Sequence, residues 1–101
     1  NLSNMSSPFY EIIMRVNNLS NPQLYFSVGC GSNCIGSIAL PTKSMTNWSK
    51  INIPLSCLEK DGLDKSKIQL RGLFSSNEAI NFDINSITIR DGDATGSMLS
   101  C

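Results

Sequence analysis

The stretch VGCGSNCIG places two cysteines four positions apart in a glycine-rich loop. Such a pair could hold a metal ion, exchange electrons or form a disulfide. Structural zinc sites usually combine two close cysteine pairs, or cysteines with histidines, but this chain has one close pair and no histidine. A thioredoxin-type redox pair has two intervening residues, whereas Cys30 and Cys34 have three. We therefore favour a local disulfide between Cys30 and Cys34, for which Gly29 and Gly31 supply backbone freedom.

The other two cysteines, Cys57 and Cys101, leave the full pairing open. Four cysteines allow three complete connectivities, and the sequence does not choose between them. A bridge from Cys30 or Cys34 to Cys57 is the main alternative. A free, buried Cys57 is another, because a lone cysteine often behaves as a small hydrophobic residue. Cys101, close to the end of the sequence, is interpreted as a free thiol.

The absence of histidine excludes Ser-His-Asp and Cys-His catalysis. The acidic side chains show no spacing that marks an acid–base pair for glycoside hydrolysis, so we expect no catalytic residue. The segments 61–66 and 91–97 contain Asp-Gly turns but lack the glutamate of an EF-hand loop. We expect no cofactor and no metal-ligand set, with a single structural calcium ion as an open alternative.

Charge and hydropathy exclude two classes of partner. The net charge is zero, and the eight Lys and Arg residues are scattered along the chain. Binding to nucleic acid through neutralised phosphates is therefore not expected. No apolar run approaches the roughly 18 residues that a membrane-spanning helix needs. The sequence thus predicts neither a nucleic-acid partner nor a membrane span.

Exposed aromatic rings could form a platform for a sugar. Tyr10 and Tyr25 are expected on the strand faces opposite to the core, and Arg15 could donate hydrogen bonds to hydroxyl groups. Trp48 stands at the entry to a strand, a position where a tryptophan more often caps the core. The candidate carbohydrate-binding residues are therefore Tyr10, Arg15 and Tyr25, with Trp48 as the fourth and most doubtful.

Short apolar runs separated by Gly, Pro, Asn and Ser predict six or seven strands and little helix. The segment 79–90 alternates throughout, with a change of parity near Asn85 and Ser86 that indicates a bulge or a break between two strands. A turn or two of helix is expected over 54–62, which Gly62 would terminate. The fold class is therefore all-β, an antiparallel β-sandwich or jelly roll. The strands are expected over 8–16, 23–29, 35–40, 48–53, 67–74 and 79–90.

Three features together resemble a known domain: GCGSNC followed by Gly36, Trp48 leading into INIPLSCLEKDGLD, and the later strand FDINSITI. The chain resembles, over roughly residues 10–90, the C-terminal accessory domain of bacterial exo-acting β-glucosidases of glycoside hydrolase family 3. That domain looks like a galactose-binding-type jelly roll. It carries further strands ahead of the matching region. We therefore expect residues 1–90 to be part of a longer accessory domain and 91–101 to be a flexible tail.

The resemblance implies a non-catalytic role beside the catalytic domains of a parent enzyme. The implied partners are those domains and a β-glucan oligosaccharide or polysaccharide. The implied location is the periplasm or exterior of a Gram-negative bacterium, where a Cys30–Cys34 disulfide would persist. Binding of β-glucan and bracing of the catalytic domains both stay open. The rival hypothesis is a free-standing β-sandwich that recruits a protein through an open edge strand and binds no sugar.

Overall fold

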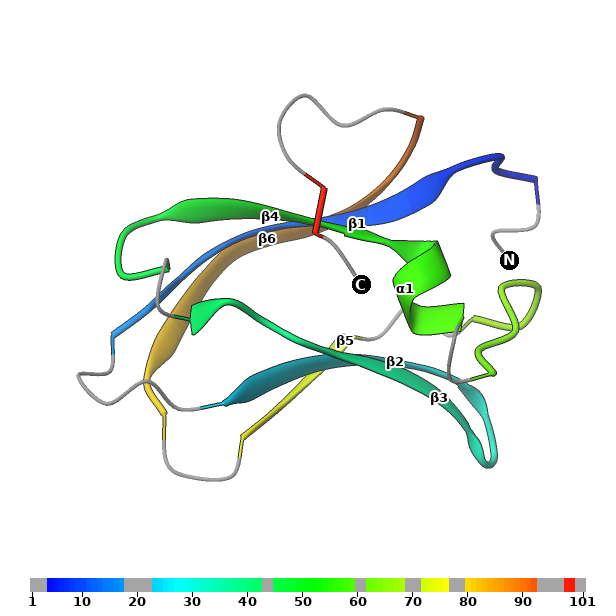
Figure 1. The fold of residues 1–101 in the computed structure, drawn as a ribbon, viewed down its shortest axis with the longest axis horizontal. Coiled ribbons are helices and arrows are strands. Elements are labelled where there is room, and N and C mark those ends of the chain that lie inside the picture. Colours follow the sequence, from blue (N-terminus) through cyan, green and yellow to red (C-terminus); the bar gives the residue numbers. More distant parts are fainter. Residues whose placement is uncertain are drawn as a thin grey trace.

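The computed structural model describes residues 4–17, 23–42, 45–59, 62–68, 72–76, 80–92 and 98–99. Two antiparallel three-stranded sheets form two layers (Figure 1). Sheet A has the order β4-β1-β6 and comprises β4 (Ser49–Pro54), β1 (Pro8–Val16) and β6 (Phe82–Asp91). Sheet B has the order β3-β2-β5 and comprises β3 (Cys34–Ala39), β2 (Leu24–Gly31) and β5 (Gly72–Ser76). The predicted all-β sandwich is confirmed.

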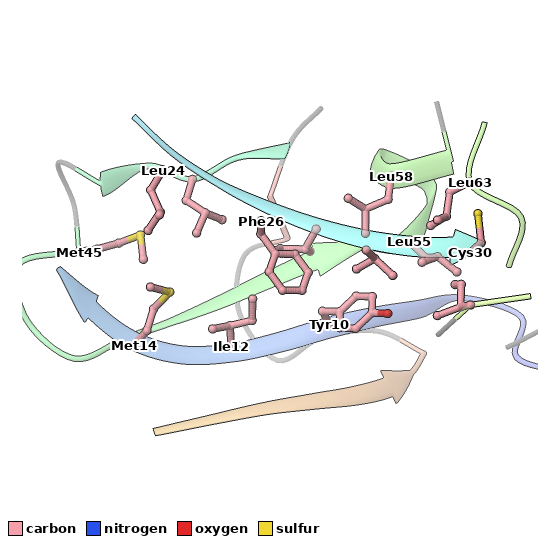
Figure 2. Close-up of a cluster of buried hydrophobic side chains, with 14 of the residues drawn as sticks. Tyr10, Ile12, Met14, Leu24, Phe26, Cys30, Met45, Leu55, Leu58 and Leu63 are labelled. Carbon is pink, nitrogen blue, oxygen red and sulfur yellow. The ribbon is translucent and has the colours of Figure 1, made fainter. Parts of the chain in front are cut away.

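The core lies between the two central strands. β1 directs every second side chain inward, from Tyr10 to Val16, and β2 does the same with Leu24, Phe26 and Val28. Figure 2 shows Tyr10, Ile12 and Met14 of β1 facing Leu24 and Phe26 of β2 between the layers. Phe26 is fully buried and packs against the rings of Tyr10 and Phe74 at centroid distances of 5.3 and 5.4 Å. Within each of these two strands, the residues that alternate with the buried ones therefore lie on the outer face of the sheet.

One side of the sandwich is closed by the short helix α1 (Leu55–Glu59), which contacts β1, β3 and β4. The Leu55 and Leu58 side chains of this helix are buried. Gly36 on β3 lets the helix approach, because a Cβ atom there would collide with the backbone carbonyl oxygen of Leu58. The predicted helix at 54–62 is therefore confirmed in position but is shorter. In the described ranges no helix is long and apolar enough to cross a membrane.

The opposite side is formed by β5 and β6, which are brought together by Phe74 and Phe82 with ring centroids 5.2 Å apart. The register between β1 and β6 shifts between Ile13 and Met14, so the predicted irregularity in 79–90 is a bulge within one strand. Ile84 and Ile87 remain 40% and 39% exposed, although they pair with the buried Met14 and Ile12. This side is therefore less completely covered than the side that α1 closes.

Two predicted segments differ in the structure. The strand expected over 67–74 is observed as β5 at Gly72–Ser76, and Ile68 is buried but precedes the strand. The segment predicted as a tail begins within β6, which includes Asp91. Met98 forms a parallel bridge with Asn52, and the Leu99 amide donates to the Asn52 carbonyl at 2.8 Å. Residues 93–97 and 100–101 lie outside the described residues.

Candidate functional site: an aromatic and charged row on sheet A

The predicted disulfide between Cys30 and Cys34 is confirmed, with the two Cα atoms 5.0 Å apart at the β2–β3 turn. Asn33 adopts a φ of 57° within this turn. The Asp64 amide donates to the Cys30 sulfur at 3.4 Å, which ties the turn to the segment after α1. Cys57 is also disulfide-bonded, so the alternative of a free Cys57 is wrong. Cys101 lies outside the described residues.

Two of the four predicted sugar-contacting residues lie together on the outer face of sheet A. The Arg15 guanidinium carbon lies 4.8 Å from the centroid of the Trp48 ring, within the range of a cation–π contact. The same guanidinium donates through Nε to Asp83 Oδ2 at 2.8 Å. The Asn17 side-chain amide donates to the same oxygen at 2.9 Å. We call Trp48, Arg15 and Asp83 the tryptophan row.

The strand register explains how this row forms. Arg15 follows the buried Met14 and precedes the buried Val16, so its side chain points outward. β6 pairs Asp83 directly with Arg15, which places both side chains on the same face. Trp48 immediately precedes β4 on the other side of β1. The row therefore crosses sheet A from one edge strand to the other.

Trp48 is 48% exposed, so the expectation that it caps the core is wrong. The apolar positions that close the core of β4 are Ile51 and Ile53, and Trp48 lies on the opposite side of the strand, against Arg15. Its large ring is held in place yet remains accessible. This combination is what stacking against the apolar face of a sugar requires.

Tyr10 does not lie on the surface. It is only 2% exposed and packs edge-to-face on Phe26, so the expectation of an exposed Tyr10 is wrong (Figure 2). Apolar residues occupy both parities of PFYEIIMRV, and sequence alternation alone selects the wrong face. Burial raises the pKa of the Tyr10 phenol, and its hydroxyl has no hydrogen-bond partner.

Tyr25 lies on the outer face of sheet B, as the alternation of β2 predicts. Its hydroxyl donates to Gln23 Oε1 at 2.9 Å, and its ring is half-buried. Tyr25 and Trp48 lie on the outer faces of opposite sheets and therefore face away from each other. One sugar cannot stack on both rings.

The tryptophan row is electrostatically balanced. The hydrogen bond from Arg15, and then that from Asn17, lowers the pKa of the Asp83 carboxyl below its ordinary value. Asp83 is therefore ionised at neutral pH and holds the guanidinium beside Trp48. Nothing in the sequence singles out Asp83 or Asn17, because the β1–β6 register that brings them to Arg15 depends on the bulge. The one available signal is a charged residue between two apolar ones, Phe82 and Ile84, which marks Asp83 as outward-facing but names no partner.

A second polar row crosses sheet A nearer to the start of β1. Glu11 Oε2 lies 3.1 Å from Arg90 Nε and 3.9 Å from Lys50 Nζ. The Glu11 side chain is 13% exposed, whereas the two cations are about half exposed. We call Lys50, Glu11 and Arg90 the charge row. The outer face of sheet A thus offers hydrogen-bonding groups at both ends.

The Asp64 carboxylate is bonded within its own turn. Asp64 Oδ1 accepts from the amide and the hydroxyl of Ser66 at 2.9 and 2.6 Å. These bonds lower the pKa of the Asp64 carboxyl. Within the part of the chain that the structure describes, no group of three or more His, Cys, Asp or Glu side chains could hold a metal ion.

A family model described as galactose-binding domain-like (Exop_C) matches residues 2–89. The chain belongs to this family. No curated protein and no solved structure matches the chain significantly. Small galactose-binding-like β domains are typically non-catalytic and serve as carbohydrate-binding or accessory modules. The disulfide of this domain fits an oxidising, extracytoplasmic compartment.

Proposed function

We propose that this domain binds β-glucan on the outer face of sheet A, as an accessory module of a secreted or periplasmic family 3 glycoside hydrolase from a Gram-negative bacterium. Membership in a galactose-binding-like family supports a carbohydrate ligand. The observation that carries the proposal is Trp48, a large ring that is 48% exposed and oriented by Arg15. The sequence resemblance supports the proposed parent enzyme.

The chemistry of the tryptophan row suits a neutral sugar. The apolar face of a pyranose ring can stack on the indole of Trp48, while its hydroxyl groups accept from Arg15 and Asn17 and donate to Asp83. The charges of Arg15 and Asp83 cancel, so the row attracts neither anions nor cations strongly. An uncharged polyhydroxyl ligand such as a glucan therefore fits better than a phosphorylated or acidic one.

Affinity electrophoresis tests the proposal directly. The intact chain is run in native gels that contain mixed-linkage β-glucan, laminarin or no polysaccharide. We expect retardation in at least one glucan and its loss in Trp48→Ala. Leu73→Ala is the matched control, because Leu73 is 59% exposed but lies on sheet B. A folded wild-type chain that migrates unchanged in both glucans would contradict sugar binding.

Bracing of catalytic domains is the second candidate. It is favoured by Ile84 and Ile87, two large aliphatic side chains about 40% exposed on the less covered side of the sandwich. Such exposed apolar groups are suited to a neighbouring domain. Sedimentation of this chain with the separately produced catalytic domains distinguishes the two functions. Bracing predicts a complex that Ile87→Lys weakens and Trp48→Ala leaves intact.

A further inference from the structure

One buried polar atom on sheet A has no hydrogen-bond partner and belongs to a residue that lines a cavity. Among the described residues, two buried side-chain oxygens lack hydrogen bonds, the Tyr10 hydroxyl and Asn52 Oδ1. Tyr10 packs within the core. Asn52 is 3% exposed but lines an open cavity of about 180 Å³. Since buried polar groups are nearly always hydrogen-bonded, the unpaired oxygen of Asn52 requires an explanation.

The walls of this cavity define what it could hold. Asn52 supplies a neutral acceptor, and Lys50 is the one charged side chain among the lining residues that the structure describes. The remaining walls are apolar, formed by Pro41, Ile51, Met98 and Leu99. An amide oxygen needs a donor, which a carboxylate or phosphate lacks when ionised. The ammonium group of Lys50 disfavours a cation. A neutral ligand with hydroxyl donors and apolar C–H surfaces satisfies both conditions.

Met98 also lines a second cavity, of about 290 Å³. Polar groups of this second cavity come from Ser6, Ser7, Ser56, Glu59 and Lys65. Met98 is fixed there by its bridge to Asn52. The two cavities that Met98 lines therefore offer donors and acceptors beyond the Asn52 oxygen.

The cavity that Asn52 lines is on the same side of sheet A as the tryptophan row. Asn52 pairs with Glu11, whose neighbours Tyr10 and Ile12 point inward, so Asn52 is on the outer side of β4. Trp48 precedes it by four residues on the same side. At roughly 3.4 Å per residue the two positions are about 14 Å apart, farther than one monosaccharide reaches. A ligand that contacts both must be an oligosaccharide.

We propose that Asn52 and its cavity form a second sugar subsite, so that the domain recognises β-glucan oligosaccharides laid along β4 from Trp48 to Asn52. This inference rests on the proposed glucan binding. The bound sugar donates a hydroxyl hydrogen to Asn52 Oδ1, which is otherwise unpaired. Recognition at both ends makes the affinity depend on the length of the glucan chain.

Calorimetric titration with β-glucan oligosaccharides of increasing length tests this subsite in the wild-type chain and in Asn52→Leu, which removes the acceptor at similar size. Asn85→Leu is the matched control, because Asn85 is exposed on β6 at the other edge of sheet A. Thermal melts confirm that each variant is folded. For the wild type and Asn85→Leu we expect affinity to rise with length and then level off. For Asn52→Leu the shortest ligands should bind normally and the longest about tenfold more weakly.

The outcomes separate the two proposals. Equal length dependence in the wild type and Asn52→Leu, with binding still lost in Trp48→Ala, overturns the Asn52 subsite and leaves glucan binding intact. Absence of wild-type binding at every length overturns both. An Asn52→Leu chain that loses the shortest ligands as well would show that Asn52 acts on the Trp48 contact itself, which also contradicts a separate subsite.

Discussion

The two outer faces of the sandwich differ in chemistry although they share one core. The face of sheet A carries the tryptophan row, which contains one ion pair, and the charge row, which contains two. The face of sheet B carries no charged side chain among its described residues, and most of these residues are small. They are Tyr25, Ser27, Gly29, Ile35, Ser37, Ala39, Leu73 and Ser75.

This difference suggests a division of roles. Hydroxyl ligands need directional donors and acceptors around an exposed ring, and the described residues of sheet A combine these at Trp48. On sheet B the hydroxyls of Ser27 and Ser37 lie 2.7 Å apart and bond to each other. A polar pair that is satisfied within the sheet has less to offer a ligand. We infer that sheet A recognises the ligand and that sheet B mainly supports the fold.

The largest effect is expected from a change that destabilises the whole fold by disturbing the contact between β3 and α1. In Gly36→Ala the new methyl group would meet the Leu58 carbonyl, a backbone atom that cannot move without shifting α1. Overpacking of this kind costs about 1–3 kcal/mol and occasionally more, which is a large share of the stability of a small domain. Urea unfolding should show a loss near the upper end of that range. Unchanged stability would mean that α1 does not press on β3.

The next effect separates the two aromatic candidates. Trp48→Ala should weaken glucan binding by about 30-fold, the effect of removing a hot-spot tryptophan worth about 2 kcal/mol. Tyr25→Ala should change the affinity less than twofold, because Tyr25 lies on the opposite face. Isothermal titration calorimetry measures both. The reverse pattern would place the binding site on sheet B.

A smaller effect is expected from Ser27→Ala on sheet B. Ser27 is 6% exposed, and its hydroxyl shares a hydrogen bond with Ser37. Loss of that bond should lower the free energy of unfolding by about 1 kcal/mol, with no change in glucan affinity. Chemical denaturation and calorimetry on the same sample provide the two readouts. Weakened glucan binding without a loss of stability would contradict the proposed division of roles.

The smallest effect is the pH dependence of the tryptophan row. The hydrogen bonds from Arg15 and Asn17 lower the pKa of Asp83 in the folded chain. The carboxylate is therefore fully ionised, and holds Arg15 beside Trp48, above the ordinary aspartate pKa of about 3.9. This hold on Arg15 is lost as the pH falls through the lowered pKa. Glucan affinity should therefore stay constant from pH 7 to about pH 4 and weaken below it. Asp83→Asn should abolish this acid-side loss, and a loss that persists in Asp83→Asn would assign it to another group.

Much of the fold could be predicted from local pattern. The alternation of β2 correctly places Phe26 inside and Tyr25 outside, and the change of parity at Asn85 correctly predicts the bulge in β6. The glycine-rich spacing around Cys30 and Cys34 predicts their disulfide. In each case the controlling interactions are close in sequence, so the sequence carries the information.

The candidate site was only partly predictable because it depends on pairings between distant strands. The sequence identifies Arg15 as a candidate. Its partner Asp83 is 68 residues away along the chain and meets Arg15 only through the pairing of β1 with β6. Tyr10 is predicted on the wrong face because apolar residues stand at both parities of β1: Phe9 and Ile13 alternate with the core-facing Tyr10, Ile12 and Met14. Asn52 carries no signal in the sequence, because its unpaired oxygen and the cavity that it lines with Met98 arise only in the folded chain.

Trp48 provides the most direct test, because it is the single tryptophan in the chain. Its fluorescence is followed during titration with mixed-linkage β-glucan and laminarin, together with its quenching by acrylamide. If sugar stacks on Trp48, the emission should shift to shorter wavelength and the quenching should fall, both saturating with glucan. Retardation by glucan in gels with unchanged Trp48 emission and quenching would contradict the account, because the sugar would then bind away from the tryptophan row.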